Sequence, residues 1–246
     1  MPVAPLLFLF RFLLVSVWIL LGLLTELLVF PPLSRRGRRR LVGAWSRVLM
    51  ALCGVRVRPL GQPVHQGAVL WVSNHISWVD IFVLNSVRTT SFIAKSDVRR
   101  WPVIGQLVAW AGTLFIDRHH RHAVREAGRQ MADCFGCGDA VGLFPEGTTT
   151  DGSDVRNFHA GLFEAAVRAG VPIQPVALRF LRRGRHAPEL AFVGEQTLVA
   201  NMWFLFRARG VSVECEFLPV ILSGDGLDRA EAAQRSHAAV RRAVVG

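Results

Sequence analysis

The chain has 246 residues, of which 51% are hydrophobic, and its formal net charge is +11. This length suits one large domain, or one domain plus an appendage, and the apolar share supports a sizeable core. Only Lys95 of the 29 basic residues is a lysine, and the chain has no tyrosine. Few aromatic residues are interleaved with the arginines, which disfavours nucleic acid as the partner and favours an anionic membrane surface.

The first long segment, Leu6–Phe30, is almost wholly apolar and includes the charged residues Arg11 and Glu26. Twenty-five helical residues would extend ~37 Å, which is enough to cross a bilayer core of ~30 Å. However, Arg11, Trp18 and Glu26 fall roughly on one side of a helical wheel. Two interpretations therefore stay open: a helix that spans the membrane, and a tilted, half-inserted helix packed against a neighbour. A cleaved signal peptide is not expected, because the N-terminus lacks a basic region.

A cluster of arginines follows this segment at positions 35, 36, 38, 39 and 40, and no acidic residue occurs between it and Asp80. Such a cluster is typical of the cytoplasmic flank of a membrane helix, where each charge contributes ~1 kcal/mol of attraction to anionic lipids. The segment Leu41–Val55 has an apolar stripe at helical spacing and predicts an interfacial helix. We therefore expect a two-helix membrane-associated unit over residues 1–55 and a second domain over residues 56–246.

From about residue 56 short apolar runs alternate with amphipathic segments, which predicts an α/β fold with a mixed, largely parallel sheet flanked by helices. The expected strands are Ala68–Val72, Thr90–Ala94, Thr113–Ile116, Ala140–Phe144, Ile173–Phe180 and Val211–Phe217. The expected helices are Asn74–Ser86, Trp101–Trp110, Arg121–Cys137, Phe158–Ala169 and Arg229–Val244.

The most informative stretch, VSNHISWVD, follows the first of these strands and contains His75 and Asp80. If both residues lay in one helix at ~100° per residue, their side chains would point ~140° apart and would not meet. If His75 lies in the turn before the helix and Asp80 in its first turn, the carboxylate reaches one ring nitrogen and leaves the other free. This pair is the histidine–aspartate half of a serine-protease triad, without the serine. The alternative is a surface turn whose aspartate only complements the helix dipole.

Polar residues stand at the ends of three expected strands: His75 with Asp80, Asp117 with Arg118, and Glu146 with Gly147. Because ligands of α/β sheets bind at the carboxyl ends of parallel strands, we expect these groups to converge on one site.

Four motifs in this order resemble the glycerolipid acyltransferases typified by bacterial 1-acyl-sn-glycerol-3-phosphate acyltransferase. They are Asn74-His75-Ile76-Ser77-Trp78-Val79-Asp80, Phe115-Ile116-Asp117-Arg118, Phe144-Pro145-Glu146-Gly147-Thr148 and Val171-Pro172-Ile173-Gln174-Pro175-Val176. The resemblance covers about residues 70–180. It implies transfer of an acyl group from acyl-CoA or acyl carrier protein, as co-substrate, to the hydroxyl of a lysolipid, with no separate cofactor.

The resemblance also implies roles for individual residues. His75 would take the hydroxyl proton and Asp80 would hold its tautomer, which makes these two the expected catalytic residues. The expected substrate-binding residues are Lys95, Arg118, Glu146, Gly147, Thr148 and Pro175. Arg118 and Lys95 would grip an anionic head group, Glu146 would bind a glycerol hydroxyl or order the cations, and Pro175 would shape the acyl pocket or the sheet edge. Backbone N–H groups near His75 or Gly147 are candidate oxyanion donors.

One departure from the family pattern concerns the acceptor. Many members carry an arginine directly after the F-P-E-G-T motif, where this chain has Thr149. The acceptor implied first is 1-acyl-sn-glycerol 3-phosphate, which would give phosphatidic acid, and lyso-ornithine lipid is the alternative. From another class, the chain could be an inactive membrane-surface binding protein.

Other chemistries have weaker signals. No G-x-S-x-G elbow supports a serine hydrolase, and His119, His120 and His122 lie among arginines and are expected to be solvated, so no metal site is expected. Cys134 and Cys137 have C-x-x-C spacing, but no second pair follows to complete a zinc site. The four cysteines are expected to be reduced thiols.

Overall fold

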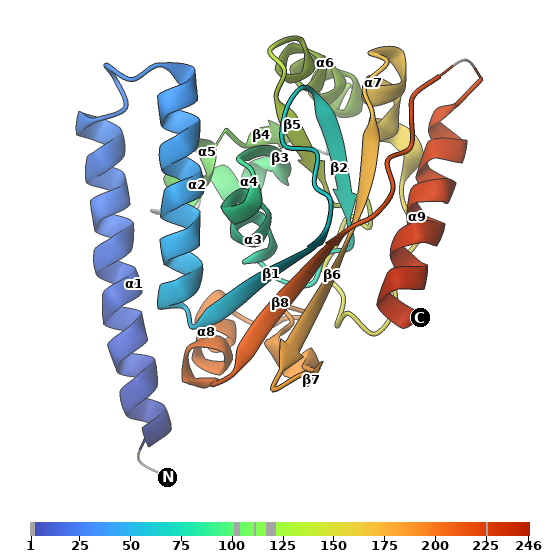
Figure 1. The fold of residues 1–246 in the computed structure, drawn as a ribbon. Helices are drawn as coiled ribbons and strands as arrows, with labels where there is room; N and C mark the ends of the chain where they lie inside the picture. The colour runs from blue at the N-terminus through green and yellow to red at the C-terminus, as the bar shows by residue number, and fades with distance from the viewer. Residues whose placement is uncertain (1–2, 101–103, 111, 117–121, 225) are drawn as a thin grey trace.

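The computed structural model describes residues 3–100, 104–110, 112–116, 122–224 and 226–246. In this part of the chain one sheet of eight strands runs in the order β1-β8-β6-β2-β5-β3-β4, and β7 pairs with β6 (Figure 1). The strands are β1 (Val55–Gly61), β2 (Val69–Ser73), β3 (Thr90–Lys95), β4 (Leu114–Ile116), β5 (Ala140–Leu143), β6 (Ile173–Arg182), β7 (Arg185–His186) and β8 (Val211–Phe217). Strand β6 is antiparallel to β8 and β7, and the other neighbouring pairs are parallel. The prediction of a mixed, largely parallel sheet is confirmed.

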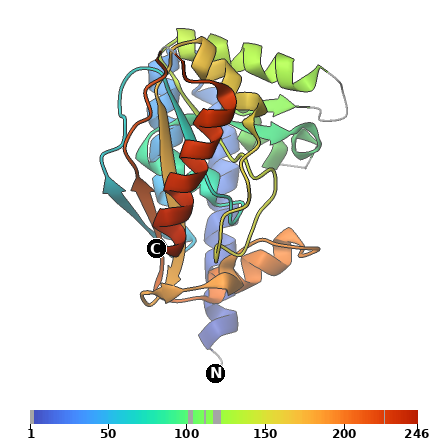
Figure 2. The ribbon, with the colours of Figure 1, turned by 90° about the vertical axis from the view of Figure 1, so that its right-hand side faces the viewer.

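Helices cover both faces of this sheet. The longer ones are α1 (Val3–Leu28), α2 (Arg35–Leu52), α3 (Asp80–Val87), α5 (Ile104–Trp110), α6 (Ala123–Gly136), α8 (Leu198–Arg207) and α9 (Arg229–Val245). The shorter ones are α4 (Ser96–Arg99), η1 (Ala160–Leu162), α7 (Phe163–Arg168) and η2 (Pro188–Leu190). Figure 2 shows α9 in front of the sheet and α1 and α2 behind it.

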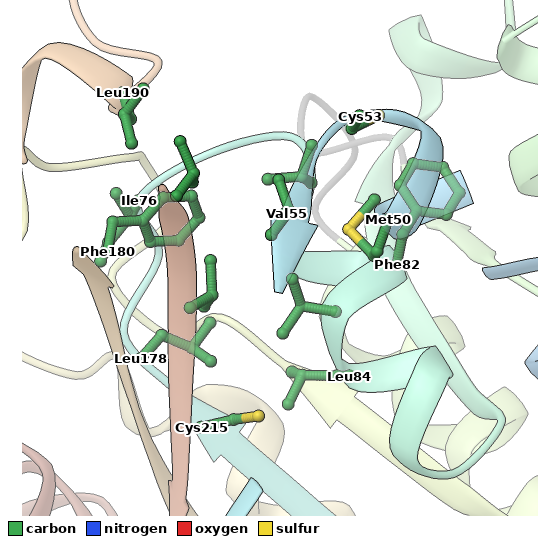
Figure 3. Close-up of a cluster of buried hydrophobic side chains, with 14 of the residues drawn as sticks. Met50, Cys53, Val55, Ile76, Phe82, Leu84, Leu178, Phe180, Leu190 and Cys215 are labelled. Carbon is green, nitrogen blue, oxygen red and sulfur yellow. The ribbon is translucent and has the colours of Figure 1, made fainter. Parts of the chain in front are cut away.

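The central strand β2 explains why both faces need cover, because all five of its residues are buried. Side chains alternate across a strand, so Val69 and Trp71 join the core beneath α2 and α3, whereas Leu70 and Val72 join the core beneath α6 and α9. Figure 3 shows part of the first core, in which Leu84 of α3 and Cys215 of β8 belong to the same cluster of buried side chains.

Helices α1 and α2 lie side by side on one flank of the molecule (Figure 1). The indole nitrogens of Trp18 and Trp45 each donate to the backbone carbonyl of the other residue, at 3.2 and 3.4 Å. Gly22 permits this approach, since a Cβ there would lie 2.7 Å from the indole nitrogen of Trp45. Helix α2 begins at Arg35, six residues before the predicted start, because the hydroxyl of Ser34 accepts the N–H of Gly37 as an N-cap.

The polar side of α1 faces the protein and its apolar side faces outward. Arg11 donates to the carbonyls of Phe206 and Ala208 at the end of α8, at 3.0 and 2.7 Å. In contrast, Leu13 and Leu27 are 62% and 67% exposed. Within the described residues, α1 is the helix long and apolar enough to cross a membrane. Its packing against α8 and α2 confirms that the helix has neighbours.

The predicted helix Asn74–Ser86 was wrong at its start, because residues 74–79 are not helical and α3 begins at Asp80. The predicted helix Phe158–Ala169 is a short 3₁₀ turn followed by α7. The sequence did not predict α8, which lies beside α1 (Figure 1).

Candidate active site

His75 and Asp80 form the centre of the candidate site. His75 lies in the loop after β2, and its Nδ1 is 2.7 Å from the carboxylate oxygen Oδ2 of Asp80. The same oxygen accepts the backbone N–H groups of Ile76 and Ser77, at 2.7 and 2.9 Å. The Asp80 side chain is fully buried, whereas that of His75 is 22% exposed. The arrangement with His75 in the turn and Asp80 in the first turn of the helix is confirmed.

Asn74 fixes the start of this loop to the neighbouring strand β6. Its side-chain nitrogen donates to the carbonyl of Leu178, and its side-chain oxygen accepts the N–H of Leu178, at 3.0 and 2.8 Å. Asn74 is fully buried, so both bonds are shielded from water. This pair holds the backbone next to His75 in the register of the sheet.

Glu146 holds the backbone of His75 from the other side. One of its carboxylate oxygens accepts the N–H of His75 at 2.7 Å, and the other accepts the N–H of Arg156 at 2.8 Å. Burial raises the pKa of Glu146, and the two N–H donors partly offset that effect. Glu146 is 4% exposed and each of its oxygens accepts one backbone N–H group, and its expected role of binding a substrate hydroxyl or ordering the cations stays a prediction. Its visible contacts position His75.

The imidazole ring of His75 packs on Phe144, with ring centroids 4.2 Å apart and planes 14° from parallel. The carbonyl of His75 accepts the N–H of Thr150 at 2.8 Å. In the described part of the chain Nε2 of His75 has no hydrogen-bond partner. The ring is therefore fixed through its Nδ1 and one face, and Nε2 is free to act on a bound molecule.

His75 lies in the wall of an apolar cavity of about 350 Å³. Several helices contribute to this wall, among them α1 with Val15 and Ile19, α2 with Trp45 and Leu49, α3 with Ile81 and Phe82, and α8 with Leu198 and Met202. Gly147, Thr148 and Thr149 form a more polar part of the wall. The positive φ of Gly147, 72°, turns the chain at this point. An apolar cavity with a histidine in its wall suits an acyl chain that carries its reacting group at one end.

The remaining predicted site residues have different outcomes. Lys95 is the last residue of β3, at the sheet edge where His75 lies, and the structure does not describe its side chain. Asp117, Arg118, His119 and His120 lie outside the described residues. Pro175 is buried inside β6, opposite Val72, and is not part of the cavity wall. Pro175 therefore belongs to the interior of the sheet, and its expected role in shaping the acyl pocket or the sheet edge stays a prediction.

Sequence reasoning missed the contribution of α8. Asn201 of this helix is fully buried, and its side-chain oxygen accepts the indole N–H of Trp78 at 2.9 Å. Trp78 lines the cavity together with Leu198 and Met202. The available signal was Thr197, which caps α8 by accepting the N–H of Ala200, followed by an apolar run interrupted by one asparagine.

Comparisons with known proteins find acyltransferases of similar sequence and fold. The chain is 39% identical over 209 residues to lyso-ornithine lipid O-acyltransferase of Pseudomonas aeruginosa, covering 85% of this chain and 80% of that protein. It is 32% identical over 199 residues to 1-acyl-sn-glycerol-3-phosphate acyltransferase of Neisseria gonorrhoeae, covering 79% and 76% respectively. The fold is similar to the crystal structure of the 1-acyl-sn-glycerophosphate acyltransferase PlsC from Thermotoga maritima, with a TM-score of 0.71 and 22% identity over 97% of this chain and 93% of that one.

The family model called Acyltransferase matches residues 55–179, which include His75, Asp80 and Glu146. Together with the extent of identity to the two enzymes, this match shows that the chain belongs to the acyltransferase family.

Proposed function

We propose that this protein is a lysolipid O-acyltransferase in which His75 is the general base and Asp80 orients it. The observation that carries the proposal is the 2.7 Å contact between Nδ1 of His75 and Asp80, in a ring whose other nitrogen has no partner in the described part of the chain. General-base catalysis contributes about 10²–10⁴ in rate.

The reaction needs no nucleophile from the protein. Nε2 of His75 takes the proton of the lysolipid hydroxyl, and that oxygen forms an ester bond with the thioester carbonyl carbon. The carbon–sulfur bond breaks, and the proton on His75 passes to the leaving thiolate. Asp80 stabilises the imidazolium that exists between these steps. We propose acyl-CoA or acyl carrier protein as the donor.

We propose lyso-ornithine lipid as the acceptor and 1-acyl-sn-glycerol 3-phosphate as the alternative. Similarity to the Pseudomonas aeruginosa enzyme supports the first, and similarity to the Neisseria gonorrhoeae enzyme supports the second. Thr149 favours the first, because it stands where many phosphate-binding relatives carry arginine and its hydroxyl donates to the carbonyl of Phe192. Loss of one charge-assisted hydrogen bond weakens binding by about 1.5–3 kcal/mol. This loss weakens binding of a phosphate more than binding of a head group that carries both an ammonium and a carboxylate.

We propose that the protein works at an anionic membrane with its catalytic domain on the cytoplasmic face. The outward apolar side of α1 and the exposed Arg35, Arg36 and Arg40 at the start of α2 support this placement. The arginines would meet lipid head groups while the apolar side of α1 contacts lipid chains.

The test is an acyl-transfer assay with purified protein in nanodiscs, using acyl-CoA or acyl carrier protein as donor and each lysolipid as acceptor. His75→Ala should lower kcat by at least about 10²-fold while the protein stays in the nanodisc. His65→Ala is the matched control, because His65 is exposed and is not among the residues of the cavity wall. Thr149→Arg should raise the preference for the phosphate-bearing acceptor. Turnover by His75→Ala at the wild-type rate would contradict the assigned base.

A further inference from the structure

A second cavity, of about 200 Å³, lies between α1 and α2. Trp45 and Phe82 belong to the walls of both cavities. His75 and the segment 147–149 line only the first of these two cavities. Thr25 and Glu26 of α1 and Ser46 of α2 are the polar members of its wall. The proposed acyl transfer leaves this cavity unused.

Glu26 is unusual among the buried acids of the described chain. It is 8% exposed, and neither a hydrogen bond nor an ion pair to it occurs among the described residues. Asp139, at 6% exposure, instead pairs with Arg35 and Arg39. Ser46 is 1% exposed, and its hydroxyl also lacks a partner in the same part of the chain. Burial without a partner favours the neutral form of a carboxyl group, and a cation bound in the cavity would stabilise its charged form, so the unpartnered Oε1 of Glu26 in this wall makes the cavity a candidate site for a cationic ligand.

The chemistry of the wall selects the kind of ligand. Among the described residues the wall contains no lysine, arginine or histidine, and both indole N–H groups near it are engaged in the Trp18–Trp45 pair. Thr25 donates its hydroxyl proton to the carbonyl of Leu21, so its oxygen can accept. The wall therefore offers oxygen acceptors from Glu26, Ser46 and Thr25, and it also presents aromatic rings. An ammonium group has three N–H donors and is attracted to aromatic faces.

We propose that the cavity between α1 and α2 binds the primary ammonium head of a membrane lipid, with Glu26 as its counter-ion. The ligand arrives from the lipid, because the wall includes Val48, which is 38% exposed, and Leu24 is 52% exposed on the outer side of α1. Aminophospholipids and ornithine lipids both carry this ammonium group. The site is separate from the acceptor position at His75, so the proposal does not rest on the identity of the acceptor.

The experiment is native mass spectrometry of the full-length protein released from nanodiscs. The discs contain phosphatidylglycerol mixed equally with phosphatidylethanolamine, with ornithine lipid or with phosphatidylcholine. We expect wild-type protein to retain phosphatidylethanolamine or ornithine lipid at least tenfold over phosphatidylglycerol, and the two arms show which source is preferred. Phosphatidylcholine has no N–H donor and should show no such preference.

Glu26→Gln keeps the shape of the side chain and removes its charge, so the preference should fall at least fivefold. Glu126→Gln, on the exposed surface of α6, is the matched control and should leave it unchanged. Since Glu26 has no described partner to lose, the variant is expected to fold. Three results would each overturn the proposal. Wild type could retain amine-headed lipid no better than phosphatidylglycerol, it could retain phosphatidylcholine as well as it retains amine-headed lipid, or Glu26→Gln could keep the wild-type preference. Binding is read without turnover, so these results are independent of the acyl-transfer assay.

Discussion

Replacing Glu146 by glutamine tests whether this residue positions His75 or touches the acceptor. Glutamine has nearly the same shape, but its side-chain nitrogen cannot accept a hydrogen bond. One of the N–H groups of His75 and Arg156, which lie 2.7 and 2.8 Å from the carboxylate oxygens, must then face another donor. The substitution therefore removes one charge-assisted bond at a site that is 4% exposed.

The magnitude follows from that single bond. A hydrogen bond to a charged group contributes about 1.5–3 kcal/mol. For a chain of this size each kcal/mol changes Tm by about 2–4 °C, so Tm should fall by about 3–12 °C. If the whole loss also appears in the transition state, kcat falls by about 10- to 150-fold. KM for the lysolipid should stay within about twofold, because the hydrogen bonds of Glu146 are to the backbone of His75 and Arg156.

The assay measures kcat and KM for the lysolipid at saturating donor, together with Tm by scanning calorimetry. Glu126→Gln is the control, since its exposed ion pair with Arg129 at 3.2 Å should contribute less than about 1 kcal/mol. A tenfold rise in KM with unchanged kcat and Tm would refute the reasoning and return Glu146 to the role of an acceptor ligand.

Three further changes test other parts of the structure. Asp80→Asn should lower kcat by about 10²–10⁴-fold, because His75 loses the carboxylate that fixes its tautomer; activity within tenfold of wild type would contradict this. Arg11→Ala should destabilise the packing of α1 on α8 by about 1–3 kcal/mol, seen as a lower Tm that Arg11→Lys partly restores; an unchanged Tm would show that these bonds do not hold the helix. At pH 8 iodoacetamide should modify the exposed Cys137 first, by peptide mass. Burial raises the pKa of Cys53 and Cys215 to about 12, which leaves about 10⁻⁴ of each as thiolate, so rapid labelling of either in folded protein would contradict their burial.

The strands were the most predictable part of the fold. Strand β8 has the predicted bounds, Val211–Phe217, and β2 is shifted by one residue from Ala68–Val72. Buried strands of this sheet are short, apolar and bounded by polar or turn-forming residues, and all of these properties are local in sequence.

The start of α3 shows where periodicity misleads. Ile76, Trp78 and Ile81 have helical spacing, yet the loop before Asp80 is not helical. The carboxylate of Asp80 accepts the N–H groups of Ile76 and Ser77, and it thereby offers the backbone an alternative to helical hydrogen bonds. In a continuous helix the side chains of His75 and Asp80 would point apart. The spacing of the motif predicts their contact only if His75 lies in a turn before the helix.

The role of Glu146 could not be predicted from residue types. A carboxylate at a strand end suggested a ligand contact, but its partners are the backbone N–H groups of His75 and Arg156. Every residue except proline has such a group, so a motif gives no sign of which one a side chain will meet. Only the folded positions of two loops decide it.

The cavity and the catalytic pair depend on the sequence in different ways. His75 and Asp80 are five residues apart in one short loop and helix start, so their pairing can be recognised as a local sequence motif. The cavity wall also includes Ile19 of α1 and Met202 of α8, and both lie outside the residues 55–179 matched by the family model. An acyl chain bound there would contact residues brought together only by long-range packing, including the bonds from Arg11 to the end of α8. The type of reaction can therefore be inferred from the motifs, whereas under the proposed function the choice of acyl chain would depend on how α1 and α8 pack together.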